Sequence, residues 1–191
     1  LKGASNIISD LYIDIGERMI GDIDILVEKN KLMKTYEIFK TKGYKIKDKN
    51  DFFYKGNKHL SRLASKNKIF SIEFHQRLFD SEKIYKLDPS KLFKTKLIIQ
   101  NTSILDFKNQ FLYNIYNYQI NDIGSLKLSY SYRTFYDAYL MEKNRNIDFN
   151  NFKIDKYLSN YLMIAREMKI PILKKFIFKE NKLNQLRFKY K

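Results

Sequence analysis

Residues 21–27 read Gly-Asp-Ile-Asp-Ile-Leu-Val, and this stretch decides the fold of the region around it. Two acidic residues, Asp22 and Asp24, alternate with branched apolar residues. Successive side chains of a β-strand point to opposite faces, so the pattern predicts a strand with both aspartates on one face and the apolar residues turned into a core. The carboxylates would lie about 6.6 Å apart along the strand, close enough to reach one hard cation. A strand with a solvated acidic face gives the same pattern.

Upstream of this strand, residues 2–5 read Lys-Gly-Ala-Ser. Together with Ala4, the apolar residues that follow have the spacing of one face of an amphipathic helix; they are Ile7, Ile8, Leu11 and Tyr12. Gly3 therefore stands where the chain turns into a helix, and a glycine there lets backbone N–H groups approach a ligand closely. Because a helix N-terminus favours negative charge, the segment suits a triphosphate. An ordinary helix start with small residues is the alternative.

Arg18 lies four residues before Asp22. Its guanidinium either supplies a further cation to phosphate groups or is a solvated loop side chain. We expect it, with Lys2, to hold the triphosphate.

Residues 69–75 alternate apolar with polar side chains, as in a half-buried strand. Glu73 then faces away from the core, as the two aspartates do. A third carboxylate is required if two metal ions are to be held, one activating a hydroxyl and one stabilising the leaving pyrophosphate. Glu73 is our candidate, with an ordinary polar-face residue as the alternative. His75 shares this face and is a candidate substrate contact, ahead of His59, although histidines near a site more often pack or form hydrogen bonds.

These segments resemble the bacterial family of uncharacterised nucleotidyltransferases in the DNA polymerase beta superfamily. The resemblance rests on L-K-G-A at 1–4, L-Y at 11–12, R-x-x-G-D-I-D-I-L-V at 18–27, K-G-Y at 42–44 and I-E-F-H-Q-R-L at 72–78. It covers roughly residues 1–80, with a looser similarity at 133–137. The resemblance implies that Gly3 and Ala4 bind phosphate, that Asp22 and Asp24 bind metal, and that Glu73 is the third acid.

The sequence departs from the superfamily pattern at the glycine turn. Members commonly have Gly-Gly or Gly-Ser there, whereas Ala4 follows Gly3, so we expect the serine contact to phosphate at Ser5. The chain also begins at Leu1 without a methionine, and we expect a segment to precede it.

The composition narrows the function classes. The chain has 191 residues, of which 44% are hydrophobic, enough for one substantial core or two small ones. It contains no cysteine, which excludes disulfides, thiolate zinc sites and cysteine nucleophiles. It has no run of 18 apolar residues, so we expect no membrane span. A cytoplasmic location fits both observations.

A formal charge of +16 favours polyanionic partners. The excess is concentrated in residues 169–191, which hold eight basic residues and one acidic residue, interleaved with aromatic residues. Basic side chains can bind phosphates and aromatic side chains can stack on bases, which makes RNA a candidate partner. A helix with inward aromatics and solvated lysines is the alternative.

The periodicity also predicts the order of elements. A helix is expected over 29–42 with Gly43 as its stop, then a short strand at 44–46 and a hairpin formed by 58–64 and 69–75. After residue 77 the pattern becomes helical, with a short helix opening at Pro89 and helices over 103–118, 125–143, 151–168 and 172–186. The aromatic residues of this half are expected to form a bundle core.

We therefore predict an α+β protein with a small mixed sheet of the nucleotidyltransferase type, followed by a helical domain. The nucleotidyltransferase core is expected at 1–80, and the helical domain with its basic end at 81–191.

The predicted function is metal-dependent transfer of a nucleoside monophosphate from a nucleoside triphosphate to an acceptor hydroxyl. Two Mg²⁺ ions are expected, with Mn²⁺ as an alternative, and Glu73 would also help to deprotonate the acceptor. Charge favours RNA as the acceptor, such as a tRNA end. The K-G turn with R-x-x-G-D-I-D also resembles nucleotidyltransferase toxins of abortive-infection systems. A protein hydroxyl, a sugar and a small alcohol stay open. The alternative function is a scaffold without turnover that binds nucleic acid or protein. Since clustered carboxylates repel, Asp24→Asn is expected to leave the metal-free fold intact or slightly stabilised.

Overall fold

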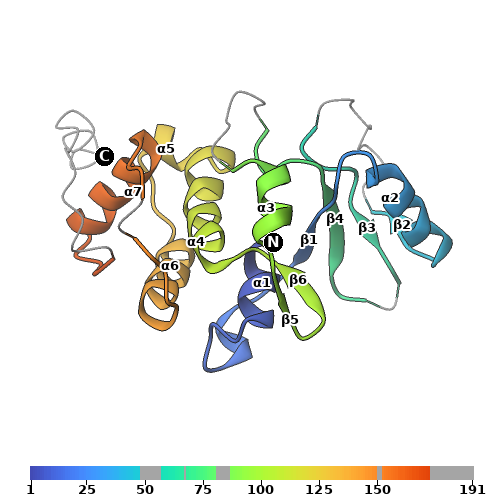
Figure 1. Cartoon of the computed structure of the whole chain (residues 1–191), viewed down its shortest axis with the longest axis horizontal. Helices are drawn as coiled ribbons and strands as arrows, with labels where there is room; N and C mark the ends of the chain where they lie inside the picture. Colours follow the sequence, from blue (N-terminus) through green and yellow to red (C-terminus); the bar gives the residue numbers. More distant parts are fainter. Residues whose placement is uncertain (48–56, 67, 81–86, 150–151, 173–191) are drawn as a thin grey trace. The chain divides into compact units, whose positions relative to one another are not determined.

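The computed structural model describes residues 1–47, 57–66, 68–80, 87–149 and 152–172. The chain divides into two compact units, Leu1–Asp106 and Phe107–Lys191. The first contains two β-sheets with helices, and the second is helical in its described part (Figure 1). The α+β prediction is therefore confirmed. The boundary expected at residue 80, between the nucleotidyltransferase core and the helical domain, stays a prediction. Residues 87–106 lie within the first compact unit.

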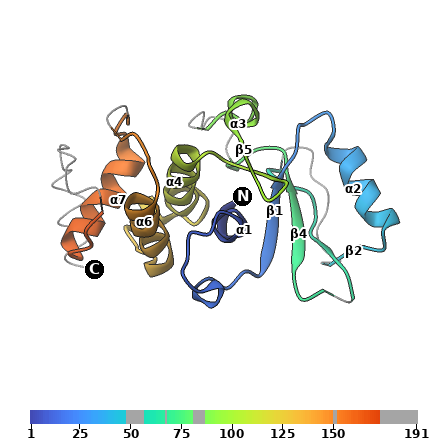
Figure 2. The same cartoon turned by 60° about the horizontal axis from the view of Figure 1, so that its bottom comes forward.

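The central sheet has four strands in the order β1-β4-β3-β2. They are β1 (Asp22–Leu26), β2 (Lys45–Ile46), β3 (Leu63–Ala64) and β4 (Ser71–His75). The pair β1 and β4 is parallel, whereas β3 pairs antiparallel with both β4 and β2. The sheet is mixed, as predicted, and β1 forms one of its edges (Figure 2).

One face of this sheet packs against helix α2 (Leu32–Thr41). The core there is apolar and consists of Val27, Leu32, Tyr36, Leu60, Leu63, Ile72 and Phe74. Phe74 is fully buried and meets the ring of Tyr36 edge-on. The helix stops where predicted, because Gly43 adopts φ +88°, a left-handed conformation that glycine takes without a steric penalty.

Helix α1 (Lys2–Ile8) packs against β1, and the terminal ammonium nitrogen of Leu1 donates to the Asp24 carbonyl at 2.8 Å. The helix is shorter than the apolar spacing predicts. Asp10 takes φ +50°, and the Leu11 N–H donates to the Asn6 carbonyl, which is a left-handed helix end. Leu11 therefore reaches the core from beyond the helix. A short 3₁₀ helix, η1 (Ile15–Glu17), then leads to β1.

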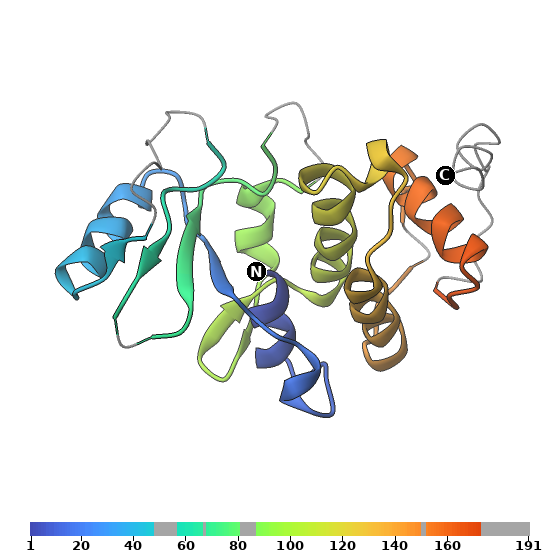
Figure 3. The same ribbon diagram turned by 180° about the vertical axis from the view of Figure 1, so that it is seen from behind.

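The first unit also contains a β-hairpin that was not predicted. After α3 (Pro89–Thr95), the strands β5 (Leu97–Ile99) and β6 (Thr102–Ile104) form an antiparallel hairpin, which lies beside α1 (Figure 3). Its two turn residues, Gln100 and Asn101, both have positive φ, as a tight hairpin turn requires. The predicted start of a helix at residue 103 is therefore wrong, whereas the short helix at Pro89 is confirmed.

The described part of the second unit contains α4 (Phe107–Tyr116), the π-helical turn η2 (Asn117–Asn121), α5 (Gly124–Lys127), α6 (Tyr132–Asn144) and α7 (Lys156–Glu167). Phe111, Tyr113, Tyr116 and Phe135 are buried, as a bundle core requires. Tyr132, in contrast, is 68% exposed and lies outside this core.

The helix predicted over 172–186 and the lysines of the basic end lie outside the described residues. Within the ranges that are described, none of the helices has both the length and the apolar character needed to cross a bilayer.

Candidate metal and nucleotide site

Three acidic side chains lie on the face of the central sheet that α2 does not cover. Asp22 and Asp24 come from β1 and Glu73 comes from β4, and the parallel register sets Asp24 directly opposite Glu73. The alternating residues of both strands, Ile25 and Phe74 among them, pack on the α2 side. Strand alternation and register together therefore bring the sequence-derived acidic candidates to one place.

Two of these carboxylates are shielded from solvent. Asp24 is 2% exposed and Glu73 is 7% exposed, whereas Asp22 is only partly buried. A solvated acidic face is therefore the wrong interpretation for Asp24 and Glu73. Buried carboxylates are costly unless they are paired and hydrogen-bonded, so the neighbouring cations matter.

His75 lies between the two buried acids. Its Nε2 donates to Asp24 Oδ1 at 2.7 Å and lies 3.3 Å from Glu73 Oε2. The imidazole is fully buried, at 0% exposure. Lys2 is the first residue of α1, and its Nζ lies 3.3 Å from the same Asp24 oxygen. Within the chain, Asp24 is thus already neutralised from two sides.

Glu73 has two further partners on the side of β3. Arg62 Nε forms an ion pair with Glu73 Oε1 at 3.2 Å, and His59 Nε2 lies 3.8 Å from Oε2. The Nδ1–H of His59 donates to the Leu60 carbonyl at 2.9 Å. Sequence reasoning overlooked Arg62. The sequence does contain a signal for it. Successive residues of a strand face opposite sides, so the neighbour of a core residue such as Leu63 points to the face that carries the acids.

These contacts shift the pKa values of the site. Burial raises the pKa of Asp22, and the charges of Asp24 and Glu73 raise it further. Burial also acts to raise the pKa of Asp24, but the hydrogen bond from His75 and the charge of Lys2 outweigh it and hold that pKa well below its usual range. The pKa of Glu73 is lowered in the same way, chiefly through His75. The pKa of His75 is raised, because its hydrogen bonds to both acids outweigh the effect of burial.

The residues predicted to bind the nucleotide lie on two sides of α1. A Cβ added to Gly3 would lie 3.1 Å from Nη2 of Arg18, so the absence of a side chain at Gly3 lets the guanidinium pass close to the helix. Arg18 Nη1 also donates to the Met19 carbonyl at 2.8 Å. Ala4 and Ser5, in contrast, line a neighbouring cavity.

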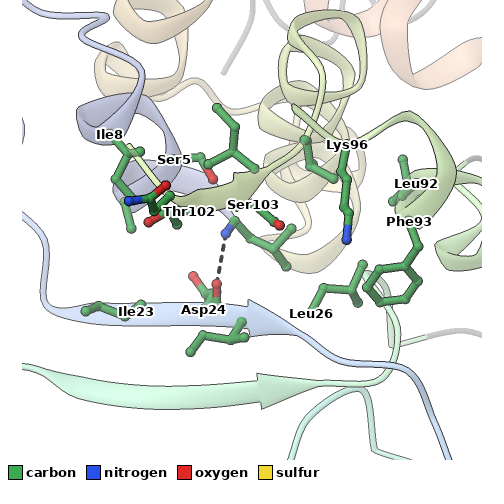
Figure 4. Close-up of a pocket in the computed structure, with 16 residues that line it drawn as sticks. Ser5, Ile8, Ile23, Asp24, Leu26, Leu92, Phe93, Lys96, Thr102 and Ser103 are labelled. Carbon is green, nitrogen blue, oxygen red and sulfur yellow. Dashed lines mark hydrogen bonds between the residues drawn. The ribbon is translucent and has the colours of Figure 1, made fainter. Parts of the chain in front are cut away.

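This cavity has a volume of about 410 Å³ and lies in the first unit (Figure 4). Its walls come from α1, the edge strand β1, the end of α3 and the hairpin β5–β6, and they include Ala4, Ser5, Ile8, Asp24, Leu26, Phe93, Lys96, Thr102 and Ser103. Most of the lining is apolar, and Lys96 extends its amino group into it (Figure 4). A largely apolar cavity with a few polar groups is typical of a small-molecule site. Lys96 and the hairpin were not predicted to belong to it.

The donor atoms of Asp24, Glu73 and His75 all lie within 4.8 Å of one another, so they can converge on one metal ion. Carboxylate oxygens suit Mg²⁺ and Mn²⁺. Asp22 follows on the same face of β1 and is more exposed, which makes it a candidate ligand at the outer edge of the cluster.

Residues 1–153 match the family described as "Uncharacterised nucleotidyltransferase". The match contains every residue of the acidic cluster and of the cavity wall. No match was found among curated proteins or among solved structures.

Proposed function

This chain belongs to the family of uncharacterised nucleotidyltransferases, and from that premise we propose that it moves a nucleoside monophosphate from a nucleoside triphosphate to an acceptor hydroxyl with the help of divalent metal ions. The observation that carries the proposal is the pairing of Asp24 with Glu73 across parallel strands, with Asp22 on the same face. Such an arrangement offers several carboxylate oxygens to hard cations, and Asp24 also lines the cavity.

Asp22, Asp24 and Glu73 would hold the ions, and Mg²⁺ and Mn²⁺ both fit these oxygen donors. When bound, the ions would activate the attacking hydroxyl and stabilise the charge that develops on the leaving pyrophosphate. Catalysis of this kind rests on positioning and charge neutralisation rather than on a covalent intermediate.

The proton of the acceptor hydroxyl needs a base that solvent and substrate can reach. Glu73 was the sequence-based choice, but its carboxylate is buried and engaged by Arg62 and His75. Asp22 is the most exposed of the three acids. We therefore assign proton acceptance to Asp22 and keep Glu73 as a ligand that completes the metal site.

The triphosphate would be held by cations near α1. Lys2 is next to Asp24, and Arg18 passes over Gly3, so both can meet phosphate oxygens that approach the acids. The nucleoside would lie in the 410 Å³ cavity, where Ala4 and Ser5 line one wall and Lys96 adds a positive charge. His75 contacts the acids directly, so its proposed role moves from substrate contact to partner of the carboxylates.

For the acceptor we propose RNA, such as a tRNA end, as in a toxin-like nucleotidyltransferase. The support is the net charge of +16 and its concentration in residues 169–191, because clustered basic residues attract polyanions. RNA and nucleoside triphosphates are both available in the cytoplasm, which we propose as the location.

The test is transfer of label from each α-³²P nucleoside triphosphate to total cellular RNA, and separately to lysate protein, with Mg²⁺ or Mn²⁺. We expect label in RNA, abolished by a chelator and in Asp24→Asn. Asp80→Asn is the matched control, since this carboxylate is exposed and pairs only at the surface with Lys58 among the contacts described. Label in protein but not in RNA would overturn the RNA acceptor and leave the transfer chemistry standing.

One observation favours the second candidate, a scaffold without turnover that binds nucleic acid or protein. Lys2, His75 and Arg62 already neutralise the buried acids within the chain, so the cluster is electrostatically tolerable without a metal ion. This candidate predicts no labelled product with either acceptor or either ion.

A further inference from the structure

The chain has only two histidines, His59 and His75, and both direct Nε2 at the same atom. The distances from these nitrogens to Glu73 Oε2 are 3.8 Å and 3.3 Å, respectively. Their rings lie 5.0 Å apart between centroids, and the two residues are joined by an isolated β-bridge. Two imidazoles thus lie beside the carboxylates, although a Mg²⁺ site requires only oxygen ligands.

The spacing around His75 fits a shared ion. Two ligands at right angles around an ion with bonds of about 2.1 Å lie about 3.0 Å apart. The separations of His75 Nε2 from Asp24 Oδ1 and from Glu73 Oε2, 2.7 Å and 3.3 Å, fall on either side of that value. One donor atom from each of the three residues also lies within 4.8 Å of the other two. His75 therefore occupies a ligand position as well as a hydrogen-bonding position.

The nature of this third donor affects which ion is preferred. Mg²⁺ takes oxygen ligands, whereas imidazole nitrogen suits first-row transition ions. Mn²⁺ accepts carboxylate and phosphate oxygens as Mg²⁺ does, and it also accepts nitrogen. A set of two carboxylates and one imidazole thus favours Mn²⁺ over Mg²⁺, without excluding a triphosphate from the remaining positions.

We propose that His75 is a metal ligand, and that Asp24, Glu73 and His75 form a site that binds Mn²⁺ in preference to Mg²⁺. Binding replaces the proton on His75 Nε2 with the ion, and the proton leaves to solvent. His59 is not one of the three ligands. Its Nε2 is farther from Glu73, and it supports the carboxylate from the side of β3. This inference rests on the proposed function for the presence of a metal ion and adds the identity of a ligand and of the ion.

The experiment is pulsed electron paramagnetic resonance of Mn²⁺ bound to the full chain, without nucleotide. A nitrogen directly bonded to Mn²⁺ modulates the electron spin echo, and selective ¹⁵N labelling of histidine changes that modulation only if the nitrogen belongs to a histidine. We expect a histidine signal in the parent chain. We also expect it in His59→Gln, where His75 is the only histidine left, and we expect it to be absent in His75→Gln.

The matched variants also give an affinity. We expect His75→Gln to weaken Mn²⁺ binding by about tenfold or more, with a smaller effect on Mg²⁺, and His59→Gln to change Mn²⁺ binding less. Because the parent and His59→Gln alone assign the ligand, the test stands even if His75→Gln does not fold.

The outcomes separate the two proposals. Bound Mn²⁺ without a histidine signal would overturn the histidine ligand and leave a metal site made of carboxylates. A signal that disappears in His59→Gln would overturn the assignment to His75. No Mn²⁺ binding at all would overturn the metal dependence of the proposed function together with this inference.

Discussion

Asp24 and Glu73 are direct neighbours across the parallel strands β1 and β4, and a single atom, His75 Nε2, lies within 3.3 Å of a carboxylate oxygen of each. Lys2 reaches the same oxygen of Asp24 that His75 contacts. Without a metal ion, the positive charge at this position is therefore supplied by the chain itself. Metal binding must compete with these internal partners, and several expectations follow from that competition.

Replacing Asp24 with asparagine should remove nucleotide transfer and also reduce stability. We expect the rate to fall by about 10²–10³-fold, in line with the loss of one strong electrostatic contact in a catalytic site. We expect the free energy of unfolding of the metal-free protein to fall by about 2 kcal/mol, because Lys2 and His75 lose a buried charged partner. Transfer assays and urea denaturation measure the two effects. An unchanged free energy of unfolding would contradict the charge pairing described for this site.

The stability of the metal-free protein should depend on pH through His75. Burial lowers the pKa of this histidine, but its hydrogen bonds to Asp24 and Glu73 outweigh burial, so the folded-state pKa lies above the ordinary value near 6.5. A group whose pKa is raised on folding contributes stability that is fully present below the unfolded pKa. This contribution is lost as pH rises through the raised pKa.

Denaturation curves above and below pH 6.5 measure this effect, with His75→Gln as the comparison. We expect the difference in stability between the parent and the variant to shrink as the pH is raised. A difference that stays constant or grows with rising pH would contradict the protonated bridge.

The substitution Gly3→Ala, which adds one methyl group, should weaken triphosphate binding. Its Cβ would lie 3.1 Å from Nη2 of Arg18, so the guanidinium must move away from α1. Loss of one charge-assisted hydrogen bond of about 1.5 kcal/mol corresponds to roughly tenfold in affinity. Gly21→Ala is the matched control, because an added Cβ there meets nothing within 4 Å. Equal losses of nucleotide affinity in the two variants would contradict the proposal that Arg18 binds the triphosphate.

The basic end should contribute a salt-dependent share of RNA affinity. Replacing Lys174, Lys175, Lys179 and Lys182 with serine should flatten the dependence of RNA affinity on salt, by roughly 0.7 to 0.9 in logarithmic slope for each phosphate contact removed. Triphosphate binding should not change. If the slope is the same in the parent and the quadruple variant, the lysines are only a solvated surface.

The arrangement of β1 and β4 was predictable because alternation in a strand has a fixed period of two. Once Asp24 and Glu73 were assigned to strands, their shared face followed. The helix end at Gly43 was predictable for a similar reason, since a local backbone preference dictates it. The hairpin β5–β6 was not, because its turn uses Gln100 and Asn101 rather than the glycine that usually marks such turns.

The neutralisation of the acids could not be read from the sequence. Lys2, Arg62 and His75 are separated along the chain and meet only through the packing of α1 and the pairing of β3 with β4. Clustered carboxylates alone indicate repulsion, and on that basis Asp24→Asn would be neutral or stabilising. The contacts of Asp24 lead us to the opposite expectation, a loss of stability.

The most direct measurement for the metal-dependent site is isothermal titration of the parent chain with each nucleoside triphosphate, in the presence of Mg²⁺ or Mn²⁺ and in a chelator. If Asp24 and Glu73 hold the ion that receives the triphosphate, at least one nucleotide should bind with metal and none should bind in the chelator, and Asp24→Asn should behave like the chelated parent. Nucleotide binding that is the same with and without metal, or no binding under either condition, would contradict the account.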